Sequence, residues 1–162
     1  MSAALGASAG ESGFDTLRDL YQEVILEHGR RPRHMRRLEP ADAVAQGDNP
    51  MCGDRVEVRL RFGAGGTVVE AAFEARGCAI SVASADLMAE AVAGQGPDAI
   101  RALAAGFDAM VRTGTCPECT DRLAALRPLA GVHDYPSRIK CATLPWNALL
   151  SALAGEKEAT RE

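Results

Sequence analysis

The spacing of apolar residues changes several times along the chain, and each change predicts a different element. Between residues 15 and 28 the apolar positions recur at helical spacing, as on one face of a helix. Asp15 or Thr16 can cap the start of this stretch, and Gly29 supplies an end. We therefore expect an amphipathic helix near the N-terminus.

A strand pattern follows in the middle of the chain. Every second residue is apolar over residues 55–62, which is typical of a strand with one buried face. Residues 63–66 are rich in glycine and form a turn signal, and residues 67–75 make a second β-prone run. Together they predict a β-hairpin, and residues 42–46 predict a further short strand.

The second half of the chain is helical in pattern. An alanine-rich stretch at residues 78–93 predicts one helix, and Pro97 opens another that runs to about residue 112. A turn-rich break at residues 113–120 follows. After this break we expect a short helix over residues 121–129.

The last helix is expected to begin just after Cys141, with Pro145 in its first turn, where a missing backbone N–H costs little. Because strands come before helices, we predict an α+β fold: a small antiparallel three-stranded sheet with helices packed on one face. Residues 14–154 are expected to form a single domain. A disordered leader (1–13) would precede it and a solvated tail (155–162) would follow it.

Length and composition agree with one small globular domain. The chain has 162 residues, of which 47% are hydrophobic and 25% charged, and this excludes a wholly disordered protein. The net charge of −4 argues against a nucleic-acid partner. No apolar run approaches the roughly 18 residues of a membrane span. The first residues lack the features of a secretory signal, so we expect no membrane partner and a cytoplasmic location.

The five cysteines are the unusual part of the composition. An odd number without a secretory signal argues against a disulfide framework and predicts thiols in a reducing compartment. Cys52 lies in a turn just before the hairpin, whereas Cys78 and Cys141 are expected at helix N-termini. A helix N-terminus favours thiolate over thiol, and thiolate is the form that binds metal and attacks sulfur.

Asp54 follows Cys52 by two residues and completes a candidate site of four ligands with the three thiolates. Zinc accepts sulfur and oxygen ligands in this number, and an iron–sulfur cluster is an alternative occupant. The alternative to any metal site is that these cysteines simply fill the core. Positive side chains close in sequence are expected to offset the charge of the site: Arg55, Arg76, Arg138 and Lys140.

Two other features receive no role in this site. Cys116-Pro-Glu-Cys119 is predicted to be a pair of surface-loop thiols. The alternative is an auxiliary redox or metal role, with His133 as a conceivable ligand. Residues 30–37 contain five arginines and either attract an acidic partner surface or form a solvated loop.

Three cysteine motifs carry a resemblance to a known family. The motifs are Asn49-Pro-x-Cys-Gly-Asp54, Gly77-Cys-Ala-Ile-Ser-x-Ala-Ser84 and Arg138-Ile-Lys-Cys-Ala-Thr-Leu-x-Trp146. They are preceded by Leu20-Tyr-Gln-Glu-Val-Ile-Leu-Glu-His28 and Arg31-Pro-Arg33. In this order the chain resembles the U-type iron–sulfur scaffold family over residues 14–154. The resemblance implies an α+β scaffold fold and a role in iron–sulfur cluster biogenesis.

Within this family the chain is more similar to the SufU branch than to the IscU branch. The IscU branch has a histidine just before the last cysteine and a Leu-Pro-Pro-Val-Lys chaperone motif, whereas this chain has Lys140 at that position and lacks the motif. The SufU branch has a lysine there and an insertion before the last cysteine, which residues 113–137 resemble.

The SufU resemblance implies a zinc-dependent sulfurtransferase. Zinc would be held by Cys52, Asp54, Cys78 and Cys141, and Cys52 would accept persulfide sulfur from a SufS-type cysteine desulfurase that carries pyridoxal phosphate. The sulfur would pass on to downstream Suf scaffold proteins. Two alternatives are a scaffold on which an iron–sulfur cluster is assembled and transferred, and a zinc-stabilised adaptor without enzymatic activity.

Overall fold

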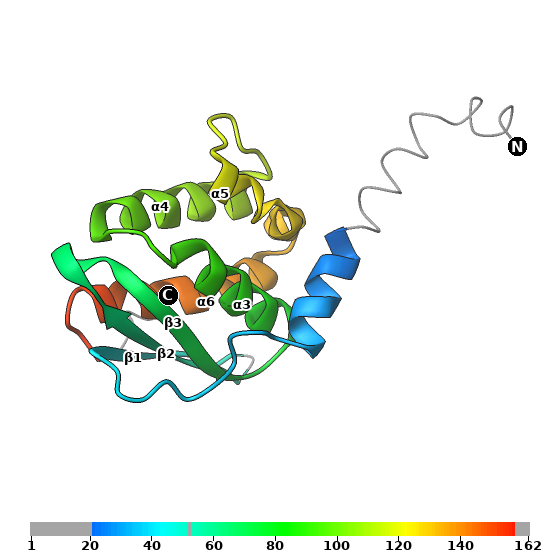
Figure 1. The fold of residues 1–162 in the computed structure, drawn as a ribbon. Coiled ribbons are helices and arrows are strands. Elements are labelled where there is room, and N and C mark those ends of the chain that lie inside the picture. Colours follow the sequence, from blue (N-terminus) through cyan, green and yellow to red (C-terminus); the bar gives the residue numbers. More distant parts are fainter. Residues whose placement is uncertain (1–20, 52, 158–162) are drawn as a thin grey trace, which may run out of the picture.

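The computed structural model describes residues 21–51 and 53–157. The expected leader, the start of the predicted N-terminal helix and Cys52 lie outside the described residues. Figure 1 shows a three-stranded sheet whose one face is covered by helices, which confirms the predicted α+β fold. None of the described helices combines the length and the apolarity needed to cross a membrane.

The sheet consists of β1 (Ala43–Asn49), β2 (Asp54–Phe62) and β3 (Val68–Arg76). All neighbours are antiparallel, and β2 lies in the centre. The predicted hairpin is β2 and β3, and the further short strand is β1, which runs on to the turn of the first cysteine motif. Alternate residues of β2, Val56 and Leu60 among them, are fully buried against the helices.

The helices are α3 (Ala79–Val92), α4 (Pro97–Thr113), α5 (Asp121–Ala124) and α6 (Pro136–Leu153), with a 3-10 segment η2 (Arg127–Asp134) before α6. α3 packs on β3, and α6 packs across β1 and β2, so these two helices cover the sheet. α4 packs on α6 and η2 farther from the sheet. There Phe107 stacks on Trp146 with ring centroids 4.7 Å apart.

The arginine-rich segment lies along the outer edge of β3. Met35 forms a parallel bridge with Phe73, and the Arg36 N–H donates to the Phe73 carbonyl at 2.9 Å. Leu38, which follows, is buried. The segment therefore protects an edge strand that would otherwise expose unpaired backbone groups.

The N-terminal helix extends beyond its predicted end. Residues 21–30 are helical, so the helix includes Gly29, which was expected to end it. A Cβ at Gly29 would lie 3.1 Å from the Cβ of Ala79. Gly29 therefore allows a close approach between this helix and the start of α3, which a larger residue would hinder.

The predicted extent of the short helix, residues 121–129, is wrong. α5 ends at Ala124, and a 3-10 segment begins at Arg127. Pro128 explains the difference, because its ring has no N–H to donate and would clash with the carbonyl four residues earlier in a continuous α-helix.

The predicted start of the last helix is also wrong. α6 begins at Pro136, so Cys141 lies inside the helix and Pro145 lies in its interior. Pro136 is a better starting residue than Cys141, because its fixed φ suits the first helical position and the N–H it lacks has no helical partner there.

Candidate metal centre

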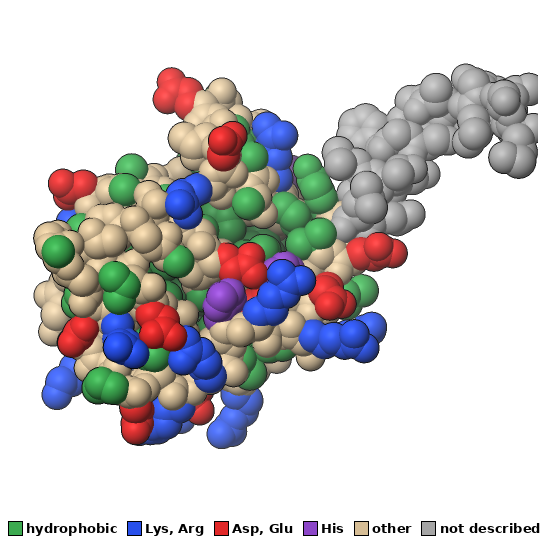
Figure 2. Space-filling view, viewed as in Figure 1, with side chains coloured by type: hydrophobic (Ala, Val, Ile, Leu, Met, Phe, Trp, Pro, Cys, Tyr) green, Lys and Arg blue, Asp and Glu red, His purple; other side chains and the backbone are tan. Residues whose placement is uncertain are grey.

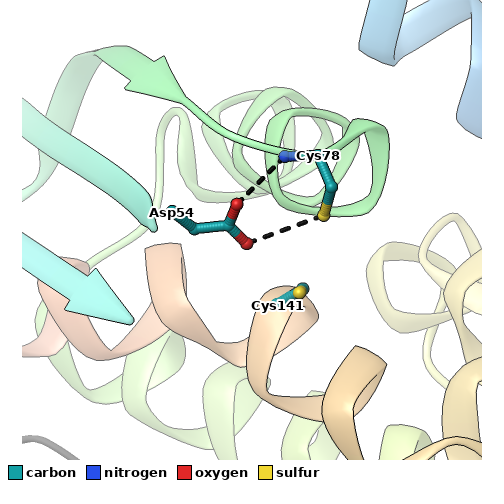
Figure 3. A group of neighbouring side chains, drawn as sticks. All are labelled: Asp54, Cys78 and Cys141. Atoms are coloured by element: carbon teal, nitrogen blue, oxygen red, sulfur yellow. Dashed lines mark hydrogen bonds between the residues drawn. The ribbon is translucent and has the colours of Figure 1, made fainter. Parts of the chain in front are cut away.

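Three of the four predicted ligands meet at one end of the sheet. Asp54 is the first residue of β2, Cys78 directly precedes α3, and Cys141 projects from α6. Their ligand atoms all lie within 4.8 Å of one another, and Figure 3 shows the three side chains facing a common point. The fourth predicted ligand, Cys52, lies outside the described residues.

The antiparallel sheet explains why distant residues meet. β2 begins where β3 ends, since Arg55 pairs with Arg76. This pairing brings Asp54 next to the segment between β3 and α3, which contains Cys78. α6 crosses β2 on the covered face and adds Cys141 from the other side.

The Asp54 carboxylate is buried, with 3% exposure, and contacts from Cys78 and Ser81 help to hold its orientation. The backbone N–H of Cys78 donates to Oδ1 at 3.0 Å. The Cys78 thiol contacts Oδ2 at 3.6 Å, and the Ser81 hydroxyl approaches the same oxygen at 3.2 Å. These contacts fix the carboxylate beside the two sulfur atoms.

Gly77 is a site residue that the sequence reasoning did not single out, although it stands in the second cysteine motif. A Cβ at Gly77 would lie 2.2 Å from Oδ1 and 2.7 Å from Cγ of Asp54. No real Cβ makes such a contact, so only glycine leaves room for the carboxylate at this position.

The electrostatic expectation for Cys141 is wrong. Because Cys141 lies inside α6 rather than at its N-terminus, the start of that helix does not favour its thiolate as expected. Burial is the main cause that raises the pKa of this thiol far above its ordinary range, and Asp54 and Cys78 raise it further. In the metal-free protein Cys141 is therefore a neutral thiol, and a metal ion must displace its proton. For Cys78, by contrast, the predicted position at the start of a helix is confirmed.

We expect the metal-free protein to lose stability in alkaline solution. In the unfolded chain Cys141 ionises near the ordinary thiol pKa of about 8.5, whereas in the folded chain its raised pKa keeps it protonated. Above about pH 8.5 the folded state therefore binds more protons than the unfolded state. The contribution of Cys141 to the free energy of unfolding is fully present below this pH and decreases above it by up to about 1.4 kcal/mol per pH unit. Urea unfolding of chelator-treated protein at a series of alkaline pH values measures the slope.

The control for this prediction is Cys141→Ser, because a serine hydroxyl does not ionise in this range. The difference between the slopes of the two proteins isolates Cys141 from the other alkaline groups. Equal slopes for the wild type and the variant would contradict a buried neutral thiol at this position.

The residues present fit a thiophilic divalent ion. Two sulfurs and one carboxylate oxygen are ligands that zinc accepts, whereas magnesium and calcium prefer oxygen alone. Gly77 makes room for Asp54, and the Cys78 N–H orients its carboxylate. Such surroundings are typical of the outer contacts of a metal site. The described residues thus bring together three of the four donors that a tetrahedral centre would need.

The positive charges predicted around the site are only partly available. Arg55 instead forms an ion pair with Asp48 at 2.8 Å. Arg76 and Arg138 are exposed and Lys140 is half-buried, and none of these three has an ion pair within the described part of the chain. They leave net positive charge close in sequence to Cys78 and Cys141.

The second cysteine pair forms a disulfide instead of the two expected thiols. Cys116 and Cys119 are bonded to each other in the loop between α4 and α5, with their Cα atoms 5.2 Å apart. The sequence reasoning missed this bond because it inferred reduced thiols from the odd number of cysteines and the lack of a secretory signal. His133 forms no metal-ligand cluster with them among the described residues; its Nδ1 contacts the Ala130 carbonyl at 3.0 Å.

A second group of metal-type ligands lies between the N-terminal helix and α3, and it consists of His28, Asp86 and Glu90. Its oxygens are already engaged. Asp86 is fully buried; its Oδ2 lies 2.5 Å from Nδ1 of His28, and its Oδ1 accepts the backbone N–H groups of Arg33 and His34, each at 2.8 Å. These contacts favour a structural clamp over a metal site.

The side chains of this clamp continue to the surface. His34 and Arg33 both contact Glu90, at 3.4 and 3.7 Å. Figure 2 shows histidine side chains beside acidic and basic ones on this face. Because the guanidinium of Arg33 already neutralises Glu90, the group holds together without an added cation.

The fold and the site define a class of protein: small α+β domains that gather cysteine and aspartate ligands at one end of a three-stranded sheet. The chain matches the NifU-like N terminal domain over residues 20–142, and it belongs to that family.

Relatives of known sequence agree with this assignment. The chain is 39% identical over 137 residues to the iron–sulfur cluster assembly scaffold protein IscU of Streptococcus pyogenes serotype M1, covering 85% of this chain and 84% of that protein. It is 36% identical over 138 residues to the zinc-dependent sulfurtransferase SufU of Bacillus subtilis strain 168, covering 85% and 92%.

Solved structures show the same fold. One crystal structure of a hypothetical protein superposes with a TM-score of 0.77 at 39% identity, covering 84% of this chain and 98% of that one. An iron–sulfur cluster assembly scaffold protein for the SUF system from Fervidobacterium islandicum AW-1 superposes with a TM-score of 0.74 at 30% identity, covering 81% and 94%. The predicted family and fold are both confirmed.

Proposed function

We propose that the protein acts in iron–sulfur cluster biogenesis as a zinc-dependent sulfur acceptor for a cysteine desulfurase. The observation that carries the proposal is the convergence of Asp54, Cys78 and Cys141 from three distant segments. The similarity to a zinc-dependent sulfurtransferase over most of both chains supports it. In this proposal Cys52 is the fourth ligand.

Zinc at this site would hold the thiols as thiolates without oxidising them, because zinc has no redox chemistry of its own. The chain's residues do the remaining work. Asp54 is oriented by the N–H of Cys78, and the buried Cys141 anchors the site in α6. Cys52 follows the exposed Met51 and precedes Gly53, whose φ of +73° suits a tight turn. We propose Cys52 as the acceptor because its two chain neighbours form this exposed turn.

The transfer step conserves atoms and charge. The Cys52 thiolate attacks the terminal sulfur of a persulfide on a cysteine of the desulfurase. A new S–S bond forms at Cys52, the S–S bond of the partner breaks, and the partner cysteine leaves as a thiolate. No net oxidation occurs, because the sulfane sulfur moves from one thiol to another. The desulfurase, with its pyridoxal phosphate, generates the persulfide.

The positive side chains close in sequence to Cys78 and Cys141 support docking of an acidic surface. Arg76, Arg138 and Lys140 have no ion pair among the described residues, whereas Arg33 and Arg36 in the arginine-rich segment pair with glutamates. Unpaired cations around a site increase the association rate with an acidic partner. We therefore place the docking face for a SufS-type desulfurase at this end of the sheet.

The second candidate function is a scaffold on which an iron–sulfur cluster is assembled. The same donor set favours it, because thiolates are the usual ligands of such clusters. Lys140 in front of Cys141 is the feature that favours the sulfur acceptor, since a lysine ammonium is a poor metal ligand.

Two successive measurements test the proposal. Metal analysis of the protein as isolated is expected to give about one zinc per chain. After turnover with a SufS-type desulfurase and cysteine, alkylation and peptide mapping are expected to find a persulfide on the peptide that contains Cys52. Protein with both loop cysteines replaced, Cys116→Ser with Cys119→Ser, is the matched control and should be labelled equally.

Protein without zinc that does not stimulate the desulfurase would overturn the proposal. A cluster that forms on anaerobic reconstitution and transfers to an apo-protein, without any persulfide on Cys52, would favour the scaffold instead.

A further inference from the structure

We propose that Ser81 is a positioning residue for the metal centre, and that Pro145 provides the second acceptor which places it. The inference rests on the proposed function, because it concerns the orientation of Asp54 as a ligand. Ser81 lies on α3, one turn after Cys78, and its side chain is buried between α3 and α6.

The first step concerns Pro145. In a regular helix the carbonyl of residue 141 accepts a hydrogen bond from the N–H of residue 145. Pro145 has no N–H, and its ring crowds the carbonyl four residues before it, so this bond of α6 cannot form. The carbonyl concerned belongs to Cys141, which is itself a predicted ligand.

The second step concerns the hydroxyl of Ser81. Its Oγ lies 3.1 Å from the Cys141 carbonyl oxygen and 3.2 Å from Oδ2 of Asp54. Both partners are acceptors, and the hydroxyl has one proton to donate. Ser81 therefore shares its one proton between β2 and α6 at the point where their candidate ligands meet, and the Cys141 carbonyl, which lacks its helical donor because of Pro145, helps to keep the hydroxyl next to Asp54.

Outer contacts of this kind orient a metal ligand and tune its affinity. The Cys78 N–H already holds Oδ1 of Asp54, and Ser81 is the hydroxyl that holds Oδ2. With one oxygen held on each side, the carboxylate cannot rotate freely. We infer that loss of the hydroxyl lowers metal affinity without removing a ligand.

Ser84 offers a matched control on the same helix. It is also buried on α3, and its hydroxyl donates to the next carbonyl of α6, that of Ala142, at 2.6 Å. Ser81 and Ser84 thus make the same link between the same two helices, but of the two hydroxyls it is that of Ser81 which also contacts Asp54.

The experiment compares Ser81→Ala with Ser84→Ala in the full chain. Zinc affinity is measured by competition with a chromophoric chelator, and the ligand set is read from the absorption bands of the cobalt-substituted protein. Ser81→Ala is expected to weaken zinc binding about 10- to 100-fold and to change the cobalt bands, whereas Ser84→Ala should stay within roughly threefold of the wild type. Both variants should show a lower Tm.

Pro145→Ala separates the two links of Ser81. Combined with Ser81→Ala, it returns an N–H donor to the Cys141 carbonyl, so the Tm should recover by more than Pro145→Ala adds to the wild type. The zinc affinity should not recover, because Asp54 still lacks the hydroxyl.

Equal losses of affinity in Ser81→Ala and Ser84→Ala would overturn the inference, because they would reflect general packing between α3 and α6. Recovery of affinity in the double variant would overturn it as well. Failure of the proposed metal site is distinguishable from either result, because the wild type itself would then bind no metal. Failure of the proposed sulfur transfer is read separately, from the absence of a persulfide on the peptide that contains Cys52.

Discussion

Alanine in place of Gly77 is expected to disable the metal centre. The added Cβ would lie 2.2 Å from Oδ1 of Asp54, so either the carboxylate or the segment before Cys78 must move. Movement also breaks the hydrogen bond from the Cys78 N–H to Oδ1, which is 3.0 Å long in the native arrangement. Two ligands are therefore displaced by one methyl group.

We expect Gly77→Ala to weaken zinc binding by roughly 100-fold or more, and to lower the free energy of unfolding of the metal-free protein by about 2 to 3 kcal/mol. Chelator competition and urea unfolding measure the two effects separately. The segment that must move begins directly after β3, whose pairing with β2 continues to Arg76. The fold should therefore survive while the site does not.

Gly131→Ala is the control for this variant. Gly131 lies in η2, and a Cβ built there meets no atom within 4 Å. Its stability and zinc affinity should remain close to those of the wild type. Unchanged zinc affinity in Gly77→Ala would show that Asp54 is not a ligand.

Alanine in place of Asp86 is expected to cost the most stability of any single polar substitution in the clamp. Asp86 is fully buried and is bonded to Nδ1 of His28 and to the N–H groups of Arg33 and His34. Its removal leaves these part-buried donors without their acceptor. Breaking a buried, charge-assisted network of this kind costs about 3 to 5 kcal/mol.

Thermal and urea unfolding of the metal-free protein measure this loss. Glu90→Ala is the matched control, since Glu90 lies one turn further along α3 and contacts the same segment from the surface. Its exposed ion pairs are worth at most about 1 kcal/mol. If the two variants lost equal stability, the carboxylate of Asp86 would not be the centre of the clamp.

The elements were largely predictable because local patterns specify them. The alternation in β2 and the glycine-rich turn after it define the hairpin without reference to the rest of the chain. The ends of the later helices were not predictable in this way. Pro128 and Pro136 act through backbone geometry, which the spacing of apolar positions does not show. Proline fixes where a helix can start or continue, and periodicity shows only which residues face the core.

The candidate ligands could be chosen from the sequence because their residue types and motifs carry the chemistry. Asp54, Cys78 and Cys141 were all selected in this way, and the structure brings them together. The environments of these residues could not be predicted from the sequence. The neutral state of Cys141 depends on burial inside α6, and the space for Asp54 depends on a glycine from the end of another strand.

The sequence alone therefore determined the family, the sheet and the identity of the candidate ligands, since each depends on residues that are neighbours in the chain. Tertiary structure decided the rest: the link that Ser81 makes between Asp54 and the carbonyl of Cys141, the clamp around Asp86 and the bond between the loop cysteines. The first two features join residues from different segments, and the third depends on the geometry of a single loop. Their energy depends on distance, burial and the direction of a donor, and only the folded chain sets those quantities.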